Sequence, residues 1–324
     1  MDFELSEDQV ALADGVRSFC EGRFPIAAVR ELAASGGVDR ARWRELGDLG
    51  VFSLRLPADA GGAELGWADA VVAFEELGRA LVPGPLVWTL LLAGVVPGAA
   101  TGEVIVGGVD RDDPSRLVEF PDRIDVLAVA DDDGLWAVSV ADLDLEALNP
   151  LDPLTPVSRL VGELPQGDRL GDAELVVALR RQGAVLTSAL LLGMAEAATD
   201  VAVAYAKDRQ QFGRPIGSFQ AMKHILADMF TRAEVARGAV YAAGVTLDDP
   251  AVGSVERAAA AAKLTAAEAA LANGKSCVQV HGGMGYTWEI DAHLFLKRAY
   301  ALEPAFGTRD EWADTMADLL DAII

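Results

Sequence analysis

The sequence predicts a mainly α-helical protein with a small β domain in the middle of the chain. Apolar residues recur at helical spacing before about residue 100 and again after about residue 171. Between these parts lie short β-type runs divided by turns such as Asp131-Asp132-Asp133-Gly134. We therefore predict an N-terminal all-helical domain (1–100), a short middle β domain (101–170) and a C-terminal antiparallel helical bundle (171–324).

Helical periodicity and turn residues define each predicted element in chain order. Ser6 is a plausible N-cap for the first helix, and alanine and leucine dominate the helices of the last part. The predicted helices are Ser6–Phe19, Arg40–Leu49, Trp67–Leu81, Leu86–Val95, Ala173–Lys207, Phe219–Val245, Ala251–His281, Ala292–Leu302 and Arg309–Ile324. The predicted β-type runs are Glu103–Gly107, Asp125–Ala130 and Leu135–Val140, and Glu146–Leu154 and Val157–Leu164 continue this polar region.

Composition limits the class of function. Apolar residues make up 52% of the 324 residues, which predicts a folded globular protein. Fifty acidic and 27 basic residues give a net charge of −23, which disfavours binding to nucleic acid or to an anionic membrane. The apolar runs Leu81–Ala99 and Gly183–Ala198 are interrupted by prolines or are short, so we expect no membrane span. The acidic N-terminus does not resemble a signal peptide.

The three histidines and two cysteines predict no metal site and no disulfide. Cys20 and Cys277 are far apart, and each lies inside a helical pattern, as buried small apolar residues do. His224, His281 and His293 have no candidate metal or triad partners nearby in the sequence, so we expect structural roles for them. A reducing cytoplasm is the expected location.

The segment Arg209–Gln220 combines arginine, phenylalanine, glutamine and glycine between two predicted helices. This mixture suits a helix-to-helix turn that binds an anionic, flat molecule. Arg209 can donate a bidentate pair of hydrogen bonds to a phosphate, and Phe212 can offer its face to a ring. Gln211 and Gln220 add hydrogen bonds without charge. The alternative is a structural turn, in which Arg209 caps a helix C-terminus and Phe212 belongs to the core.

A second motif follows about 70 residues later, Gln279-Val280-His281-Gly282-Gly283-Met284-Gly285-Tyr286-Thr287. Its glycines allow the backbone to approach a ligand closely, although they also suit an ordinary turn between helices. Both motifs, in this order, and the helical–β–helical arrangement resemble the acyl-CoA dehydrogenase family. The N-terminal Phe3–Gln9 and the Pro57…Gly61-Gly62 segment are also similar to the family pattern.

The resemblance implies a flavoprotein that uses FAD to oxidise the α,β bond of an acyl-CoA thioester. It also implies an electron-transfer flavoprotein or similar acceptor, and a dimer or higher oligomer whose cofactor site is completed across a subunit interface. Carried over by motif, the cofactor-binding residues are Arg209, Gln211, Phe212, Gln220, Gln279, Gly282, Gly283 and Thr308.

The sequence departs from the family at the catalytic base. The reaction needs a carboxylate that removes the α-proton, and the family places this glutamate before a Gly-Thr dipeptide or early in the long helix before the arginine motif. Those positions correspond here to Phe306, before Gly307-Thr308, and to about Gly183. Glu303, one helical turn before Phe306, is a weak candidate, and Glu174 and Glu196 are weaker still.

A second departure lies in the β domain, where the family carries Thr or Ser and an aromatic residue beside the flavin. Trp136 and Ser139 are the only nearby residues of those types, and their spacing does not fit.

Three hypotheses follow from these departures. The chain is a working acyl-CoA dehydrogenase; or it is a catalytically reduced subunit that completes the FAD site of a homologous partner in a mixed oligomer; or it is a non-enzymatic helical scaffold. The missing base and the reduced β domain favour the second hypothesis over the first, and the resemblance implies the same, because actinobacterial relatives that act on steroid or other bulky acyl-CoA side chains form such mixed assemblies. The scaffold is the least favoured, since a pure scaffold has no reason to keep Arg209 in an acidic protein. A flavin oxidase or monooxygenase on the same fold is a further alternative.

Overall fold

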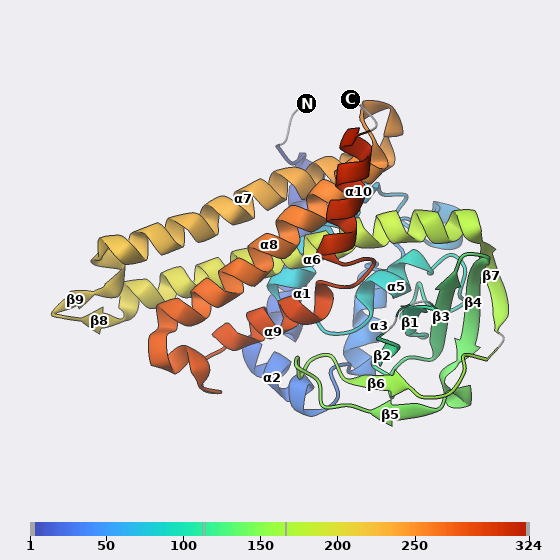
Figure 1. Ribbon diagram of the computed structural model, residues 1–324, viewed down its shortest axis with the longest axis horizontal. Coiled ribbons are helices and arrows are strands. Elements are labelled where there is room, and N and C mark those ends of the chain that lie inside the picture. Colours follow the sequence, from blue (N-terminus) through green and yellow to red (C-terminus); the bar gives the residue numbers. More distant parts are fainter. Residues whose placement is uncertain (1–3, 112, 114, 166, 322–324) are drawn as a thin grey trace. The chain divides into compact units, whose positions relative to one another are not determined.

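The computed structural model describes all residues except 1–3, 112, 114, 166 and 322–324, so Phe3 of the N-terminal motif lies outside the described residues. Backbone contacts group the chain into two compact units that do not follow chain order. The helical unit combines Met1–Ile26, Trp67–Val82 and Ala184–Ile324, and the mixed unit combines Ala27–Gly66 and Pro83–Gly183. The mainly α fold class with a small β region is confirmed (Figure 1), whereas the division at residues 100 and 170 stays a prediction.

The helical unit consists of long helices and the short segments that join them. Its helices are α1 (Glu7–Arg23), α4 (Trp67–Arg79), α7 (Gln220–Asp248), α8 (Val255–His281), α9 (Ala292–Leu302) and α10 (Arg309–Asp321), together with α6 (Ala173–Asp208) from Ala184 onward. The predicted N-cap is confirmed, because Ser6 Oγ accepts the Gln9 N–H at 3.2 Å while Gln9 Oε1 accepts the Ser6 N–H at 3.1 Å. This reciprocal pair is a capping box.

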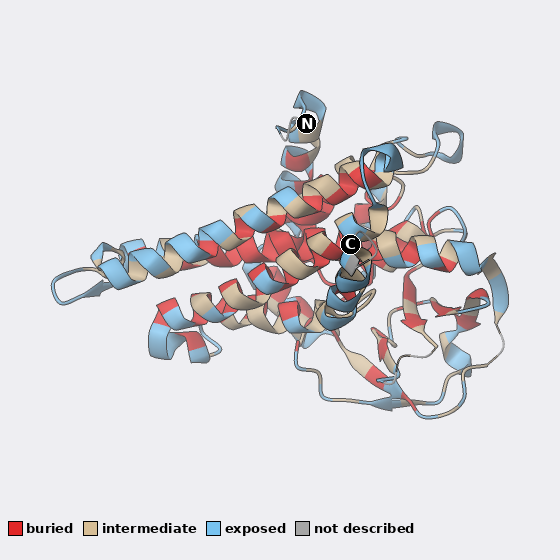
Figure 2. Ribbon diagram, turned by 45° about the horizontal axis from the view of Figure 1, so that its top comes forward, coloured by how far each residue is buried: buried red, intermediate tan, exposed pale blue. Residues whose placement is uncertain are grey.

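Small residues let the helices of this unit approach closely. A Cβ on Gly78 of α4 would lie 2.1 Å from the Leu190 carbonyl oxygen of α6, and one on Gly193 would lie 1.9 Å from the Glu75 carbonyl oxygen. All residues of α6 from 184 to 199 are buried. Figure 2 shows the buried residues gathered along the middle of the long helices, where the alanine-rich faces meet.

The mixed unit packs short helices against two small sheets. Its helices are α2 (Ile26–Ala34), α3 (Arg40–Asp48) and α5 (Leu86–Leu91), and α6 begins here. The first sheet has the order β1 (Val106–Asp110), β3 (Val126–Asp131), β4 (Gly134–Ser139) and β7 (Asp168–Asp172). The second has the order β2 (Leu117–Glu119), β6 (Val157–Leu160) and β5 (Leu145–Ala147). Only the β1–β3 pair is parallel among these, and a core of residues such as Leu92, Val106, Ala128, Leu135 and Val176 lies against the first sheet.

The structure corrects several predicted elements of the mixed unit. The strand expected at Glu103–Gly107 lies at Val106–Asp110, because its register is set by pairing with β3. The helix expected at Leu86–Val95 ends at Leu91. In the regions expected at Glu146–Leu154 and Val157–Leu164 the structure has only the short strands β5 and β6. The elements α2, β2 and β7 were not predicted.

Helix α6 is long and apolar enough to cross a membrane by length and composition alone. However, 67% of its most apolar window is buried against other parts of the described chain. Burial of this kind is typical of a core helix and gives no support to a membrane span.

Candidate functional site

The connection from α6 to α7 is a β-hairpin, which corrects the predicted helix-to-helix turn. Strands β8 (Gln210–Gln211) and β9 (Arg214–Pro215) pair antiparallel. Phe212 and Gly213 form the tip with φ angles of 54° and 78°, as a two-residue hairpin turn requires. The Phe212 side chain is 92% exposed. An exposed phenyl group on a strained backbone gives this chain no core packing, so the tip is suited to contact with another molecule.

The two arginines of this hairpin have different surroundings. The Arg214 guanidinium lies over the Phe219 ring, with Cζ 4.1 Å from the ring centroid. Arg209 is exposed, and its guanidinium has no hydrogen bond or ion pair with the described residues. Its backbone N–H donates to the Tyr205 carbonyl at 2.9 Å, and its carbonyl accepts the Ile216 N–H at 2.8 Å. Both guanidinium groups are therefore open to an external anion, and Arg209 does not act through its side chain as a helix cap.

The glycine motif forms the end of α8 and the 3₁₀ segment Gly282–Tyr286. Gly285 is required by internal packing, because a Cβ there would lie 2.4 Å from the Val278 carbonyl oxygen. A Cβ on Gly282 or Gly283 would meet no atom within 4 Å. Gly282 has a φ of 60° and a ψ of −139°, which favours glycine. For Gly283 neither strain nor packing within the described chain explains the missing side chain.

A ring contact brings the two motifs together. Tyr205, one helical turn before Arg209, packs against His281, which precedes Gly282, with ring centroids 4.1 Å apart. His281 is buried, and its Nδ1 lies 2.8 Å from the Cys277 carbonyl oxygen, which supports the structural role expected for it. We call residues 209–220 and 279–286 the hairpin end. Among the described residues no cluster of His, Cys, Asp or Glu could hold a metal ion.

The chemistry of the hairpin end fits a cofactor with phosphate groups and flat rings. A free guanidinium can bind a phosphate, an exposed phenyl group can stack on a ring, and open glycine backbone can approach closely. Seven of the eight predicted cofactor-binding residues are exposed here: Arg209, Gln211, Phe212, Gln220, Gln279, Gly282 and Gly283. The residues present therefore fit FAD.

The eighth, Thr308, belongs to a separate turn between α9 and α10, which we call the 303–308 turn. Eleven residues of α9 separate the two regions, a helix about 16 Å long. The Thr308 backbone N–H and hydroxyl both donate to Glu311 Oε2, at 2.7 and 3.0 Å. This places Thr308 at the start of α10 as part of its cap, and its role toward a cofactor stays a prediction.

The 303–308 turn places Phe306 in a left-handed backbone conformation. Phe306 has a φ of 57° and Gly307 a φ of 102°. The indole N–H of Trp312 donates to the Phe306 carbonyl at 3.0 Å. A bulky residue with positive φ costs about 1–2 kcal/mol, so the surrounding bonds must hold it there. Strain of this kind is concentrated at functional sites. Position 306 is where the resemblance places the catalytic base, but a phenyl group cannot accept a proton.

Other carboxylates do not supply an obvious base. Glu303 Oε1 accepts the Arg309 N–H at 2.7 Å, so it caps α10. Gly183 is buried, and the buried stretch that follows it on α6 has no carboxylate before Glu196. Glu196 pairs with Arg79 at 2.8 Å and with Arg237. Glu174 is exposed in the first turn of α6.

A buried ionic cluster around Glu75 is a feature that the sequence reasoning missed. Glu75 of α4 accepts a hydrogen bond from the Tyr241 hydroxyl at 2.8 Å and lies near Glu196 and Arg237. Burial, reinforced by Glu196, raises the pKa of Glu75 to about 8. The sequence signal is Glu75-Glu76 inside an otherwise apolar helix. The cluster ties α4, α6 and α7 together, and we give it a structural role.

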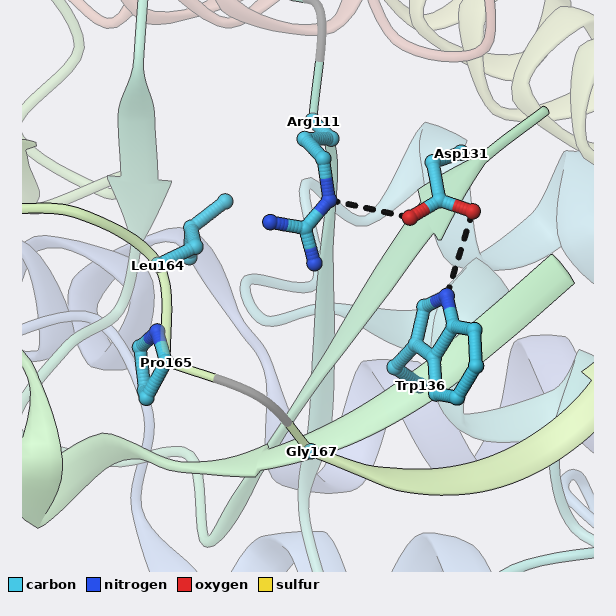
Figure 3. A pocket seen from close by; sticks show the side chains of 6 residues that line it. All are labelled: Arg111, Asp131, Trp136, Leu164, Pro165 and Gly167. Atoms are coloured by element: carbon cyan, nitrogen blue, oxygen red, sulfur yellow. Dashed lines mark hydrogen bonds and ion pairs between the residues drawn. The ribbon is translucent and has the colours of Figure 1, made fainter. Parts of the chain in front are cut away.

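A separate hollow of about 240 Å³ lies in the mixed unit (Figure 3). Arg111 Nε and Trp136 Nε1 both donate to the Asp131 carboxylate, at 2.9 and 3.1 Å, and the Arg111 guanidinium points into the hollow between Leu164 and Trp136. Of the two residues considered from the sequence, Trp136 lines this hollow and Ser139 is exposed at the end of β4. The guanidinium charge of Arg111 suits a small anion.

Comparison with known proteins agrees with the two motifs. The family description "Acyl-CoA dehydrogenase, C-terminal domain" matches residues 179–320, and "Acyl-CoA dehydrogenase, N-terminal domain" matches residues 6–100. Acyl-CoA dehydrogenase IpdE2 of Mycolicibacterium smegmatis is 34% identical over 319 residues, which cover 94% of this chain and 96% of that protein.

Two further similarities differ in what they cover. Acyl-CoA dehydrogenase FadE34 of Mycobacterium tuberculosis is 34% identical over 98% of this chain, but the match covers 48% of FadE34, so this chain spans about half its length. A chain in the crystal structure of the ChsE4–ChsE5 complex from Mycobacterium tuberculosis shares the fold, with a TM-score of 0.84, 23% identity and 99% of both chains covered. With these matches, the chain belongs to the acyl-CoA dehydrogenase family of FAD-dependent oxidoreductases.

Proposed function

We propose that this chain is a subunit of an FAD-dependent acyl-CoA dehydrogenase in which the catalytic base comes from a second, homologous chain. The observation that carries the proposal is the 303–308 turn. Its backbone presents position 306 in a strained conformation with φ 57°, yet the side chain there is a phenyl group. A protein that keeps the arrangement but not the carboxylate is suited to an assembly in which another chain abstracts the proton.

The residues of this chain have definite roles in that reaction. FAD, when bound, supplies the acceptor for the hydride that leaves the β-carbon. The base removes the α-proton of the acyl-CoA, and in this proposal that group is not on this chain. Arg209 would bind the cofactor phosphates, Phe212 would offer its face to a ring, and the open backbone at Gly282 and Gly283 would allow the cofactor to approach closely. Each of these groups is exposed, which supports a site completed at an interface with another subunit.

Two similarities support a mixed assembly. ChsE4–ChsE5 is a complex of two proteins, and one of its chains has the fold of this protein over nearly its whole length. FadE34 is about twice as long as this chain. We extend the proposal to an electron-transfer flavoprotein or similar electron acceptor and to a cytoplasmic location, as the family resemblance implies.

Flavin content tests the proposal directly. The chain is purified alone and after co-expression with a homologue from the same genome that has glutamate at the position aligned with Phe306. We expect flavin colour and acyl-CoA-dependent bleaching, under anaerobic conditions, only in the mixed assembly. A yellow homo-oligomer that acyl-CoA bleaches would overturn the need for a second chain.

Arg209→Ala in the mixed assembly separates a cofactor role from a purely structural one. A charge-assisted hydrogen bond contributes about 1.5–3 kcal/mol, so we expect flavin affinity to fall roughly 10- to 100-fold. Lys223→Ala is the matched control, because Lys223 is also cationic and exposed, one turn into α7. Unchanged flavin affinity in Arg209→Ala would mean that the hairpin end does not bind the cofactor.

A further inference from the structure

Lys263 is a fully buried lysine in the alanine-rich helix α8. Its side chain is 0% exposed, and its Nζ donates to the Ala305 carbonyl at 2.5 Å. No carboxylate among the described residues forms an ion pair with it. Isolated buried charges are costly and rarely kept without a reason. The reaction and the cofactor roles proposed above make no use of this group.

Ala305 lies in the 303–308 turn, directly before Phe306. Lys263 therefore holds the Ala305 carbonyl from α8, while Trp312 holds the next carbonyl, that of Phe306, from α10. Two consecutive carbonyls bound by side chains of two different helices leave little freedom to the peptide between them. The positive φ angle of Phe306 lies between these two carbonyls, and that of Gly307 follows the second.

The charged groups that act on Lys263 are two carboxylates, Glu303 and Glu311, and each of them accepts a hydrogen bond from a backbone N–H. Glu303 follows α9 and accepts the Arg309 N–H, and Glu311 of α10 accepts the Thr308 N–H. Arg309 itself pairs with Glu268 on α8 at 2.8 Å. Burial lowers the pKa of Lys263 to about 7, and the negative charges of Glu303 and Glu311 oppose this lowering. Burial therefore brings the pKa of Lys263 close to neutral pH.

We propose that Lys263 is the positioning residue of the 303–308 turn: from inside the bundle, its ammonium group fixes the Ala305 carbonyl and so the direction in which position 306 faces. Its importance for catalysis rests on the proposed function, in which position 306 faces the reacting part of an acyl-CoA. The ammonium form makes a charge-assisted bond, and the neutral amine makes a weaker one. The turn is therefore most ordered on the acid side of the Lys263 titration.

The same group affects stability in the opposite direction. Because the pKa in the folded state lies below the ordinary value of 10.5, the unfolded chain binds more protons between about pH 7 and pH 10.5. The contribution of Lys263 to the free energy of unfolding therefore rises with pH in this window, while its hold on the turn weakens. A purely structural lysine would give no such local loosening.

Fluorine NMR of the full chain labelled with 5-fluorotryptophan tests the proposal. The chain has six tryptophans, and Trp312→Phe identifies the resonance of the one that bonds the turn. We expect this resonance to shift with a midpoint near pH 7 in the unmodified protein. Trp136, in β4 of the mixed unit, is the control, and its resonance should not follow this titration.

Two substitutions assign the titration to Lys263. Lys263→Met should abolish it, and Lys263→Arg should hold the Trp312 resonance at its acid-side position, because a guanidinium does not lose its proton in this range. Glu303→Gln should move the midpoint to lower pH, because it removes a negative charge that raises the pKa of Lys263. A Trp312 resonance that is constant from about pH 5.5 to about pH 8.5, or that titrates equally in Lys263→Met, would overturn the proposal.

A kinetic measurement separates this proposal from the proposed function. In an active Phe306→Glu protein, Lys263→Met should lower kcat roughly tenfold with KM unchanged, because the base would be misplaced rather than the substrate lost. An unchanged kcat would contradict the positioning role. If Phe306→Glu gains no activity, the proposed function is weakened, while the fluorine titration still decides the role of Lys263.

Discussion

At the hairpin end Arg209, Phe212 and Gln279 face solvent. In the 303–308 turn, by contrast, three backbone groups (the Ala305 and Phe306 carbonyls and the Thr308 N–H) are bonded to side chains of the surrounding helices. At the hairpin end the side chains of Arg214 and Phe212 contact the Phe219 ring, and we propose that the exposed residues there contact another molecule. The 303–308 turn is the reverse, because the chain itself holds a strained backbone in place. This contrast is what the proposed function predicts for a chain that binds the cofactor with its exposed residues and holds position 306 in place without a base there.

Restoring the base is the change from which we expect the largest effect. Phe306→Glu places a carboxylate on a turn that is already held in position, and a general base contributes about 10²- to 10⁴-fold to a rate. The measurement is acyl-CoA-dependent flavin reduction in the mixed assembly, with the other chain's own glutamate replaced by glutamine. Turnover should rise within that range.

Phe306→Gln is the matched control, since a glutamine side chain has nearly the same shape as a glutamate side chain but cannot take the proton. Equal turnover in the glutamate and glutamine variants would show that the carboxylate is not what this turn lacks. The catalytic role proposed for the 303–308 turn would then be lost, whereas the cofactor role proposed for the hairpin end would be unaffected.

Glycines in the two regions test how tightly each is held. Gly307 has a φ of 102°, and a Cβ there would lie 2.7 Å from Trp312 Nε1. Gly213 has a φ of 78°, but a Cβ there would meet nothing within 4 Å. We expect Gly307→Ala to lower the free energy of unfolding by about 2–4 kcal/mol and Gly213→Ala by about 1 kcal/mol. Chemical denaturation measures both, and equal losses would contradict the difference in rigidity.

Much of the helical unit could be predicted from the sequence, because long helices repeat their pattern many times. The helix predicted at Ala292–Leu302 has those bounds in the structure, and Ala173–Lys207 differs from α6 by one residue. The short strands could not be placed as well. Three-residue β2 has no period to detect, and it exists because β6, about 40 residues later, pairs with it. Pairing between segments so far apart in the chain is tertiary structure and leaves no signal in the local sequence.

The candidate site shows the same limit. The two motifs indicated cofactor chemistry, but the contact between Tyr205 and His281 that joins them is visible only in the fold. Lys263 had a local signal, because it lies on the face of α8 that also carries the buried Ala259, Ala262, Ala266 and Ala270. What the sequence could not show is that the Ala305 carbonyl lies at the end of its side chain.

The smallest expected effect on stability, and the sharpest test of the hairpin end, comes from Gly283→Ala. No atom of the described chain lies within 4 Å of the new Cβ, and the φ angle of Gly283 is not positive. The free energy of unfolding should therefore change by less than about 0.5 kcal/mol, while flavin affinity in the mixed assembly should fall. Gly285→Ala is the control, because its Cβ would lie 2.4 Å from the Val278 carbonyl oxygen and should destabilise the fold. If Gly283→Ala binds flavin as well as the unmodified chain, Gly283 does not face the cofactor. The exposed residues of the hairpin end would then be explained by contact with another protein.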